Sequence, residues 1–317
     1  MQQVSVIIPN YNGKKYLESL MEALSVQTCR HFEVIVVDNG STDGSAAFLY
    51  EQYPETRVLC FPENLGFARA VNEGIRASSL PYVLLLNNDT VPDREFVREM
   101  LQAIRRHKKA FSCQARMMQL HAPELLDDAG DCYSALGWAF ARGKGKKADR
   151  YMEEQRIFSS CAGAAIYRRK LFSRTGLFDE EHFAYLEDLD IGYRARLLGY
   201  ENWYAPKAVV LHVGSGTSGS RYNQFKTRYS SRNNVYLIYK NMPAAQIILN
   251  LPLLAAGFGI KLVFFTFRGL GREYLAGIKN GFSISRRDKK LPFSLTRLPA
   301  YARIQMELWK NLFLRFR

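Results

Sequence analysis

Short apolar runs alternate with helical patterns along the N-terminal third of the chain. The apolar runs are bounded by Pro, Gly, Asn or Asp and predict buried strands at Val4–Ile8, Phe32–Asp38, Val58–Phe61 and Pro81–Leu86. Between them, apolar residues recur at helical spacing and predict helices over Tyr16–Leu24 and Gly66–Ala77. Strands that are apolar throughout and alternate with helices are typical of a parallel sheet covered on both faces. We therefore predict an α/β fold that binds its ligand at the carboxyl ends of the strands.

The pattern loosens after Phe111. The basic, glycine-interrupted stretch Arg142–Lys147 predicts a mobile loop, either as solvated surface or as a phosphate contact. A late strand is predicted at Val209–His212, followed by a flexible glycine-rich segment over Gly214–Gly219.

The C-terminal region has a different character. Residues Ala244–Phe267 are strongly apolar and long enough to reach across a bilayer. Asn250, Pro252 and Lys261 interrupt the segment and weaken the case for a span, and the basic residues that follow suit an anionic membrane surface. Three arrangements stay open: monotopic or re-entrant association, a span, and packing on the domain. We predict an α/β domain over residues 1–240 and a helical, membrane-associating region over 241–317.

Charge and cysteine content narrow the function classes. The chain has 44 basic and 30 acidic residues, a formal charge of +14, which favours an anionic partner such as nucleic acid, nucleotide phosphates or a membrane surface. The five cysteines are scattered, without the pairs typical of zinc or redox sites. With no signal-peptide pattern at the N-terminus, we expect reduced thiols and a cytosolic setting.

Two acidic motifs are candidates for chemistry. The run Tyr185–Arg194 holds three carboxylates and an arginine, and Asn87-Asn88-Asp89 directly follows an apolar strand. Acidic residues at a helix start often only complement the helix dipole. Two such motifs in separate parts of one α/β domain instead suggest a metal site and a base.

Five motifs in order carry a family resemblance over roughly the first 240 residues. They are Val6-Ile7-Ile8-Pro9-Asn10-Tyr11-Asn12, Val36 to Gly44 (VVDNGSTDG), Asn64 to Arg69 (NLGFAR), Leu86-Asn87-Asn88-Asp89 and Glu187-Asp188. The chain resembles the inverting glycosyltransferases of family 2, and most of all their bacterial rhamnosyltransferase branch. The resemblance implies the GT-A fold, a Rossmann-like nucleotide-binding architecture with a mixed, mainly parallel sheet and helices on both faces.

The resemblance also implies a nucleotide-sugar site at the first strands. Pro9, Tyr11, Asn12 and Asp38 would hold the base, with Asp38 accepting from the ring N3–H. The alternative for Asp38 is a turn or helix cap.

Asn64, Gly66 and Arg69 would contact the ribose and diphosphate, in keeping with the same resemblance. Arg69 is otherwise a surface helix residue. Arg228, with other cations of Gly219–Asn234, resembles part of a flexible loop that closes over the diphosphate.

Asn87-Asn88-Asp89 stands where the family has its metal motif, with an amide in place of the first carboxylate. Asn87 and Asn88 would contact the nucleotide-sugar, while Asp89 supplies the main charge to Mg²⁺ or Mn²⁺. His212 matches a third metal ligand of relatives, although a lone histidine is often structural.

Asp188 corresponds to the catalytic base and Glu187 to a residue that holds acceptor hydroxyls, with the reversed assignment as the alternative. Asp190 and Arg194 are expected to pair one helical turn apart. Gly163 would let the backbone approach sugar and acceptor, or serve close packing. Trp138 would stack on an acceptor sugar, or anchor a core or interface.

The function implied is transfer of a sugar, best dTDP-rhamnose, to a lipid-linked or polysaccharide acceptor of a cell-surface glycan, at the cytoplasmic face of the inner membrane. UDP-hexoses and UDP-N-acetylhexosamines are alternative donors. A catalytically inactive membrane-bound scaffold and a nucleic-acid-binding protein are alternatives of other classes. We expect no nucleic-acid partner, because the basic residues do not interleave with aromatics as a stacking surface would.

Overall fold

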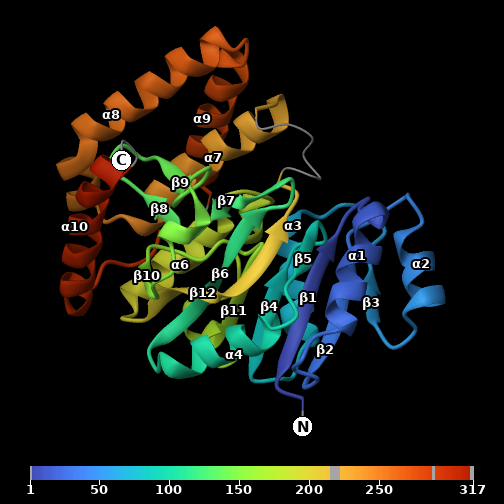
Figure 1. Ribbon diagram of the computed structural model, residues 1–317. Helices are drawn as coiled ribbons and strands as arrows, with labels where there is room; N and C mark the ends of the chain where they lie inside the picture. Colours follow the sequence, from blue (N-terminus) through green and yellow to red (C-terminus); the bar gives the residue numbers. More distant parts are fainter. Residues whose placement is uncertain (1, 215–221, 288–289, 315–317) are drawn as a thin grey trace.

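A single large sheet forms the centre of the computed structural model, which describes residues 2–214, 222–287 and 290–314 (Figure 1). Its strand order is β10-β12-β6-β11-β4-β1-β2-β3, with β5 added to β12 and β7 added to β6. The strands are β1 (Val4–Asn10), β2 (Phe32–Asp38), β3 (Arg57–Cys60), β4 (Tyr82–Leu86), β5 (Thr90–Pro92), β6 (Ala110–Gln119), β7 (Ala122–Asp128), β10 (Gln155–Ile157), β11 (Ala164–Arg168) and β12 (Glu201–His212). A separate hairpin joins β8 (Asp131–Tyr133) to β9 (Ala139–Ala141).

The strand directions divide the sheet into two parallel groups joined by one antiparallel strand. β3, β2, β1 and β4 are mutually parallel, as are β12 and β6. β11 runs antiparallel to both β4 and β6 and joins the two regions. The sheet is therefore mixed and mainly parallel along its N-terminal half, as the sequence predicts.

Helices cover both faces of the sheet, as expected. The helices are α1 (Lys14–Ser25), α2 (Ser45–Gln52), α3 (Phe67–Ala77), α4 (Phe96–Arg106), α5 (Phe172–Thr175), α6 (Glu187–Leu197), α7 (Gln224–Asn241), α8 (Ala244–Phe267), α9 (Gly271–Ser285) and α10 (Leu298–Leu314). One apolar core packs α1, α2 and α4 on the sheet, and a second packs α3, α5 and α6. Neighbouring residues of β1 alternate between them, with Ile7 in the second core and Val6 and Ile8 in the first.

The helices α2 and α4 were not predicted, but the predicted N-terminal strands and helices match β1 to β4, α1 and α3 to within two residues at each end. The late strand does not, because β12 begins at Glu201, eight residues before the predicted start at Val209. Its middle holds Pro206 and a register shift between Ala205 and Val209, which breaks the apolar alternation on which the prediction depended. The glycine-rich segment predicted after Val213 lies, from residue 215 on, outside the described residues.

One loop prediction is wrong. Residues 219–234 were expected to form a flexible loop, yet α7 begins at Gln224, and the side chain of Asn223 caps it by accepting from the Lys226 N–H (2.7 Å). Thr227 and Ser231 of this helix are buried. The cations Lys226, Arg228 and Arg232 are therefore fixed on a helix, and Arg221 lies outside the described residues.

The C-terminal helices share a core with the α/β part of the chain. This third core cluster combines α6, α7, α8, α10 and the β8–β9 hairpin, through residues that include Tyr133, Leu189, Tyr193, Leu237, Leu254, Ile304 and Leu308. The helical region predicted for the C-terminus is thus present. Among the described residues, α8 is the one helix that is long and apolar enough to cross a membrane by length and composition.

Candidate active site

Three buried polar side chains link the carboxyl ends of β1, β2 and β4. Asn88, just after β4, donates from Nδ2 to Asn10 Oδ1 (2.7 Å), and Asn10 donates from Nδ2 to Asp38 Oδ1 (2.9 Å). All three are at most 4% exposed. Because unpaired buried polar groups are costly, this chain of bonds holds the three strand ends at a fixed spacing. Asn10 was named in a motif without a role, and its burial at a strand end could have assigned it this one.

The residues predicted to hold the base surround this chain of bonds. Pro9 is half-buried in β1, and Tyr11 is 36% exposed beside it. Asn12 accepts from the Thr42 N–H (2.8 Å), which ties the turn after β2 to the end of β1. Asp38 Oδ2 accepts from the Ser41 N–H at 3.3 Å, the turn contact that the alternative reading foresaw. A role for Asp38 in base recognition stays a prediction.

Asn64 and Gly66 have structural tasks that the sequence did not reveal. Asn64 Oδ1 accepts from Asn39 Nδ2 and from the Gly66 N–H, both at 2.9 Å. Gly66 has a φ of +89°, and a Cβ there would lie 2.6 Å from the Phe183 ring. Glycine is therefore required at this position by its backbone angle and by the close approach of Phe183. This contact brings the loop before α3 against the loop before α6.

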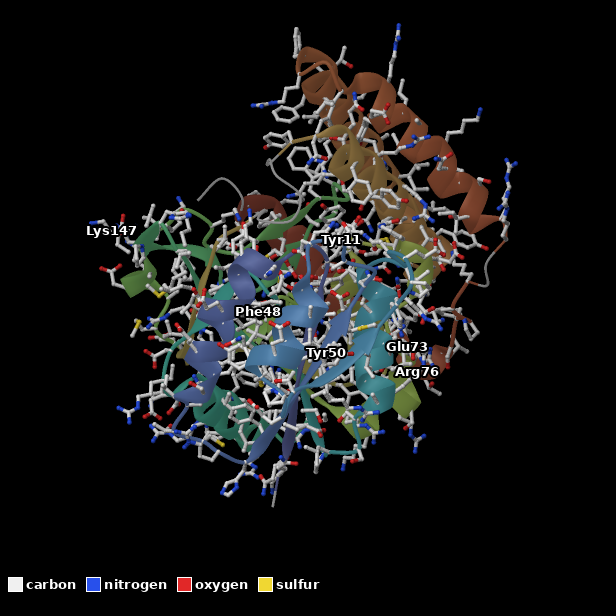
Figure 2. The ribbon with its side chains drawn as sticks, turned by 90° about the vertical axis from the view of Figure 1, so that its right-hand side faces the viewer. Tyr11, Phe48, Tyr50, Glu73, Arg76 and Lys147 are labelled. Atoms are coloured by element: carbon white, nitrogen blue, oxygen red, sulfur yellow. The ribbon has the colours of Figure 1, made fainter. Side chains whose placement is uncertain are left out.

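The guanidinium of Arg69 is engaged in ion pairs with acidic side chains. It forms ion pairs with Glu73 (2.9 Å) and Glu180 (2.8 Å) on the surface of α3. Figure 2 shows Glu73 and Arg76 of the same cluster close together, and their ion pair is 2.6 Å long. The ion pairs agree with the alternative of a surface helix residue, and the contact of Arg69 with the diphosphate stays a prediction.

Asp89 and His212 meet at the ends of β4 and β12. Asp89 Oδ1 lies 3.2 Å from His212 Nε2, and Asp127 Oδ2 lies 2.8 Å from His212 Nδ1. Lys144 in turn donates to Asp127 (2.5 Å). Burial lowers the pKa of His212, but its hydrogen bonds to Asp127 and Asp89 outweigh this and raise the pKa to about 9. The histidine is therefore held between two carboxylates.

This arrangement fits a divalent cation. Two ligands of one octahedral ion at about 2.1 Å lie about 3 Å apart, close to the 3.2 Å between Asp89 Oδ1 and His212 Nε2. A carboxylate on the other ring nitrogen, here Asp127, is the usual support of a metal-binding histidine. A cation at Nε2 would replace the proton that His212 shares with Asp89. Asp127 was missed in the sequence because it lies far from both ligands along the chain.

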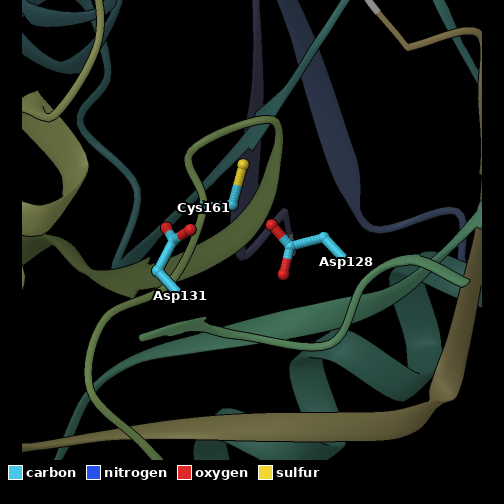
Figure 3. A group of neighbouring side chains, drawn as sticks. All are labelled: Asp128, Asp131 and Cys161. Carbon is cyan, nitrogen blue, oxygen red and sulfur yellow. The ribbon is translucent and has the colours of Figure 1, made fainter. Parts of the chain in front are cut away.

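The predicted base lies in a second, adjacent acidic group. Asp188, at the start of α6, accepts from the Leu189 N–H (2.7 Å) and from the Ala162 N–H. Asp131 of β8 hydrogen-bonds to Asp188. Asp128, Asp131 and Cys161 place one ligand-type atom each within 4.8 Å of one another (Figure 3). The hairpin residue Asp131 thus contacts the residue predicted as the base, and no motif in the sequence pointed to it.

Burial controls the protonation of these acids. It raises the pKa of Asp131 well above its ordinary value, with further contributions from the charges of Asp188, Asp128 and Glu187. Burial also raises the pKa of Glu187, which is 5% exposed and whose Oε2 has no hydrogen-bond partner among the described residues. Burial raises the pKa of Asp188 too, but hydrogen bonds with Leu189, Ala162 and Asp131 oppose this rise. Because the pKa of Asp131 is raised well above its ordinary value, the proton of the Asp131–Asp188 bond belongs on Asp131.

The Asp89–His212 pair and the predicted base, Asp188, lie on either side of the short segment that contains Ala162 and Gly163. The Asn87 N–H donates to the Gly163 carbonyl (2.9 Å), two residues before Asp89. The Ala162 N–H bonds to Asp188. A Cβ at Gly163 would lie 3.0 Å from Asn87 Nδ2 and 3.3 Å from Met117, so glycine serves close packing there. Its predicted contact with sugar and acceptor is not tested by this packing.

The loop that leads into α6 is held in a strained form. Phe183, Tyr185 and Leu186 all have positive φ, of 60°, 74° and 66°. Asn233 of α7 donates from Nδ2 to the carbonyls of His182, Ala184 and Tyr185, at 2.8–2.9 Å. Positive φ at bulky residues is costly and persists only where the surroundings enforce it. Asn233 is therefore a positioning residue for the start of α6.

The rest of α6 is anchored by a buried ion network. Asp190 is fully buried and pairs with Arg194 (2.8 Å), as predicted, and with Lys240 of α7 (3.2 Å). Asn241 adds a hydrogen bond to Asp190 (2.8 Å). Burial alone would raise the pKa of Asp190, but Arg194 and Lys240 hold it well below its ordinary value.

Two predicted contacts lie elsewhere. Trp138 is 8% exposed and donates from its indole to the Gly257 carbonyl of α8 (3.0 Å). The prediction that Trp138 stacks on an acceptor sugar is therefore not supported, and its alternative role as an interface anchor is. Arg228 lies on α7, about half exposed and 3.9 Å from Glu273. Its predicted contact with the diphosphate has no support from this pairing.

Comparison with known proteins adds a family and a fold. The family described as glycosyl transferase family 2 matches residues 5–176. An N-acetylglucosaminyl-diphospho-decaprenol L-rhamnosyltransferase of Mycobacterium tuberculosis is 29% identical over 242 residues, which cover 68% of this chain and 77% of that protein.

Solved structures share the architecture at low identity. The mannosyltransferase PcManGT from Pyrobaculum calidifontis, in complex with GDP-Man and Mn2+, has a TM-score of 0.55 and 16% identity, covering 96% of this chain and 87% of its own. GalNAc-T7 with UDP, GalNAc and Mn2+ has a TM-score of 0.61 and 16% identity over 75% of this chain, and the match spans 48% of that protein's chain. At these identities the likeness shows the fold alone, which is the GT-A architecture expected from the motifs.

Proposed function

Because the chain belongs to glycosyl transferase family 2, we propose that it transfers a sugar from a nucleotide-diphosphate donor to an acceptor hydroxyl with inversion at the anomeric carbon. One observation carries this proposal. The Asp89–His212 pair and the Asp188 carboxylate flank the same short segment around Gly163. A leaving diphosphate and an attacking hydroxyl need a cation and a base on opposite sides of the reacting carbon.

Asp188 is the base of this proposal. It would accept the proton of the acceptor hydroxyl while that oxygen bonds to the anomeric carbon and the bond to the nucleotide diphosphate breaks. The Asp131 hydroxyl donates to Asp188 and keeps the negative charge on it. The Leu189 N–H fixes the direction of the carboxylate. Glu187, buried with an unpartnered oxygen, would hold an acceptor hydroxyl.

Asp89 and His212 would hold the divalent cation, Mg²⁺ or Mn²⁺. When bound, the cation neutralises the charge of the leaving diphosphate. Asp127 orients His212 through Nδ1, and Lys144 fixes Asp127. Because positions 87 and 88 carry amides, Asp89 is the carboxylate that the Asn87-Asn88-Asp89 motif contributes.

For the donor we propose dTDP-rhamnose, and for the acceptor a lipid-linked or polysaccharide hydroxyl of a cell-surface glycan, reached from the cytoplasmic face of the membrane. The relative from Mycobacterium tuberculosis, whose name gives a rhamnosyl donor and a decaprenol-linked acceptor, supports both. UDP-hexoses and UDP-N-acetylhexosamines stay as the second candidate donors, since GalNAc-T7 was solved with UDP. Family membership, with Asp89, Glu187 and Asp188 all present, favours an enzyme over an inactive scaffold or a nucleic-acid-binding protein.

Calorimetric titration of the purified chain tests the donor and the cation together. We expect dTDP-rhamnose to bind in manganese and to lose most of its affinity in chelator. Asp89→Asn should show the same weak binding in manganese as the native chain does in chelator, while Asp188→Asn keeps native affinity. Tight binding of a UDP-sugar instead would replace the donor, and binding unaffected by chelator would refute the cation site.

A further inference from the structure

The exposed side of α8 carries apolar side chains along its whole length. Ile248, Leu249, Leu251, Ile260, Val263 and Phe267 are each more than half exposed. Over this helix, 17% of the most apolar window is buried. The one charged residue inside α8, Lys261, lies partly buried over the Trp138 ring. An apolar surface of this length without a charge is unusual for a protein face in water.

The opposite side of α8 is fixed to the rest of the protein. Gln246, Asn250, Leu254 and Gly257 form one buried stripe at helical spacing. Gln246 Nε2 and Asn250 Nδ2 both donate to Gln305 of α10, at 2.9 and 2.8 Å. A Cβ at Gly257 would lie 2.0 Å from the Leu136 carbonyl, so the helix is seated directly on the β8–β9 hairpin.

The attachment sets a limit on how α8 can meet a bilayer. Only the ten residues from Phe258 to Phe267 extend past the buried stripe, a length of about 15 Å at 1.5 Å per residue. The hydrocarbon core is about 30 Å thick. A span would therefore require α8 to leave Gln305 and the hairpin, exposing buried amide groups.

Beyond the stripe, α8 is paired with α9 and not left free. Phe265 stacks on Tyr274 at 5.2 Å, and Gly271 lies against Thr266. In Figure 1, α8 and α9 form a hairpin away from the sheet. Exposed apolar residues continue on α9 with Leu275 and Phe282.

Positive charge gathers on the same region. Residues 241–317 contain 13 Lys and Arg against 3 Asp and Glu, so they carry +10 of the formal charge of +14. Arg268, Arg272, Lys279, Arg286 and Arg287 are exposed around the hairpin. Arg268 also stacks on Phe264 (4.8 Å) at the end of α8. Apolar residues beside cations are complementary to an anionic lipid surface.

We propose that α8 lies in the plane of an anionic membrane, with its exposed apolar stripe in one leaflet and the cations of α8 and α9 at the headgroups. In this proposal α8 binds the surface of a bilayer and does not span it, although a span was one of the arrangements that the sequence left open. It deepens the proposed function, because α8 seats on the hairpin whose first strand holds Asp131, the partner of Asp188. A lipid-linked acceptor would then approach the base from the membrane side.

Flotation of the full chain with lipid vesicles tests the surface, without donor or acceptor. We expect binding to vesicles that contain phosphatidylglycerol, weakened by salt. The double variant Val263→Ser with Phe267→Ser should lose at least tenfold in partitioning. The control, Val26→Ser with Tyr50→Ser, likewise removes one exposed valine and one exposed aromatic residue (54% and 58% exposed) from the region of α1 and α2, and should bind as the native chain does.

The charge contribution is measured in the same assay. Arg268→Gln with Arg272→Gln should weaken binding about 25-fold on anionic vesicles, at about 1 kcal/mol per residue, and change nothing on phosphatidylcholine. Native binding by the Val263/Phe267 variant, or no binding by the native chain, would overturn the proposal. Sugar transfer to a water-soluble acceptor is measured separately, so a chain that binds vesicles but transfers nothing refutes only the proposed function.

Depth distinguishes the in-plane helix from a span. Single cysteines at Ile248, Ile260 and Phe267, in a chain with Cys29 and Cys60 changed to Ser, are labelled with a polarity-sensitive dye and quenched by lipids brominated at shallow or deep positions. We expect all three to report the same shallow depth. Depths that increase progressively along α8 would show a span and contradict the proposal.

Discussion

Two aspartates beside α6 have opposite effects on the stability of this protein. Asp131, which is half-buried, and Asp190, which is fully buried, both lie close to α6. The loss of solvation dominates the pKa of Asp131, whereas two cations dominate the pKa of Asp190. The pKa of Asp131 is raised, so its ionisation opposes folding. The pKa of Asp190 is lowered, so its ionisation supports folding.

Asp131→Asn and Asp190→Asn should therefore change stability in opposite directions. For Asp131 the native chain loses stability as the pH rises from the unfolded-state value of about 3.9 toward its raised pKa, so Asn should stabilise the protein by about 1–3 kcal/mol near pH 8. For Asp190 the favourable contribution is present above about pH 4 and is lost in acid, so Asn should cost about 3–5 kcal/mol near neutral pH by leaving the buried Arg194 guanidinium without its carboxylate partner.

Denaturant unfolding at about pH 5 and about pH 8 measures both effects. The gain from Asp131→Asn should grow between these values. A loss of stability in Asp131→Asn at the higher pH would show that Asp131 is ionised in the native protein, and would contradict the shared proton.

The positions of candidate residues along the chain could be predicted, but their partners could not. Asp89, His212 and Asp188 were predicted from the resemblance to family motifs, and each lies near the end of a strand or at the start of a helix. Asp127 lies in β7 and Asp131 in β8, and neither belongs to a motif. Only the folded chain brings Asp127 to His212 and Asp131 to Asp188. Arg69 is a motif residue, but the motif did not predict its ion-pair partner Glu180, which lies 111 residues away along the chain.

At the scale of elements, α7 organises the start of α6. The strained loop before α6 has no hydrogen-bonded ladder of its own, and Asn233 supplies donors to three of its carbonyls. Sequence patterns predicted β1 to β4, α1 and α3 well, because each is set by its own apolar periodicity, but did not predict α2 or α4. They failed for α7, whose buried Thr227, Ser231 and Asn233 are polar and give no apolar stripe.

Asn233→Ala should lower the turnover number by at least tenfold, because the loop would relax and Asp188 would lose its position. Donor affinity should change little, since the strand ends that would hold the nucleotide do not contact Asn233. Steady-state kinetics with separate donor titrations checks this split. Ser230→Ala is the control on the same helix, as its hydroxyl donates to the carbonyls of Lys226 and Thr227 within α7. Equal turnover in both variants would show that Asn233 does not position the base.

For the whole molecule, the C-terminal helices complete the core under the candidate active site. Leu254, Ile304 and Leu308 pack with Tyr193 and Leu189 of α6. The domain boundary that the sequence predicts at residue 240 stays a prediction. The shared core indicates that the two parts fold together.

A chain that ends at residue 240 should therefore fold poorly. It would expose Tyr193 and Leu197, which are at most 2% exposed in the full chain, and large apolar groups lost from a core contact cost about 2–5 kcal/mol each. Soluble yield and thermal unfolding measure the effect, with a chain shortened only by its last three residues as the control. Unfolding of the 1–240 chain at the temperature of the full chain would show an independent domain.

The most direct test of the account is the rate of sugar transfer by the native chain, Asp188→Asn and Glu187→Gln, with dTDP-rhamnose and UDP-sugars in manganese. We predict that Asp188→Asn loses about 10²- to 10⁴-fold in turnover, the usual contribution of a general base, while Glu187→Gln keeps measurable transfer at a higher acceptor KM. Native turnover by Asp188→Asn, with loss in Glu187→Gln instead, would contradict the assignment of the base.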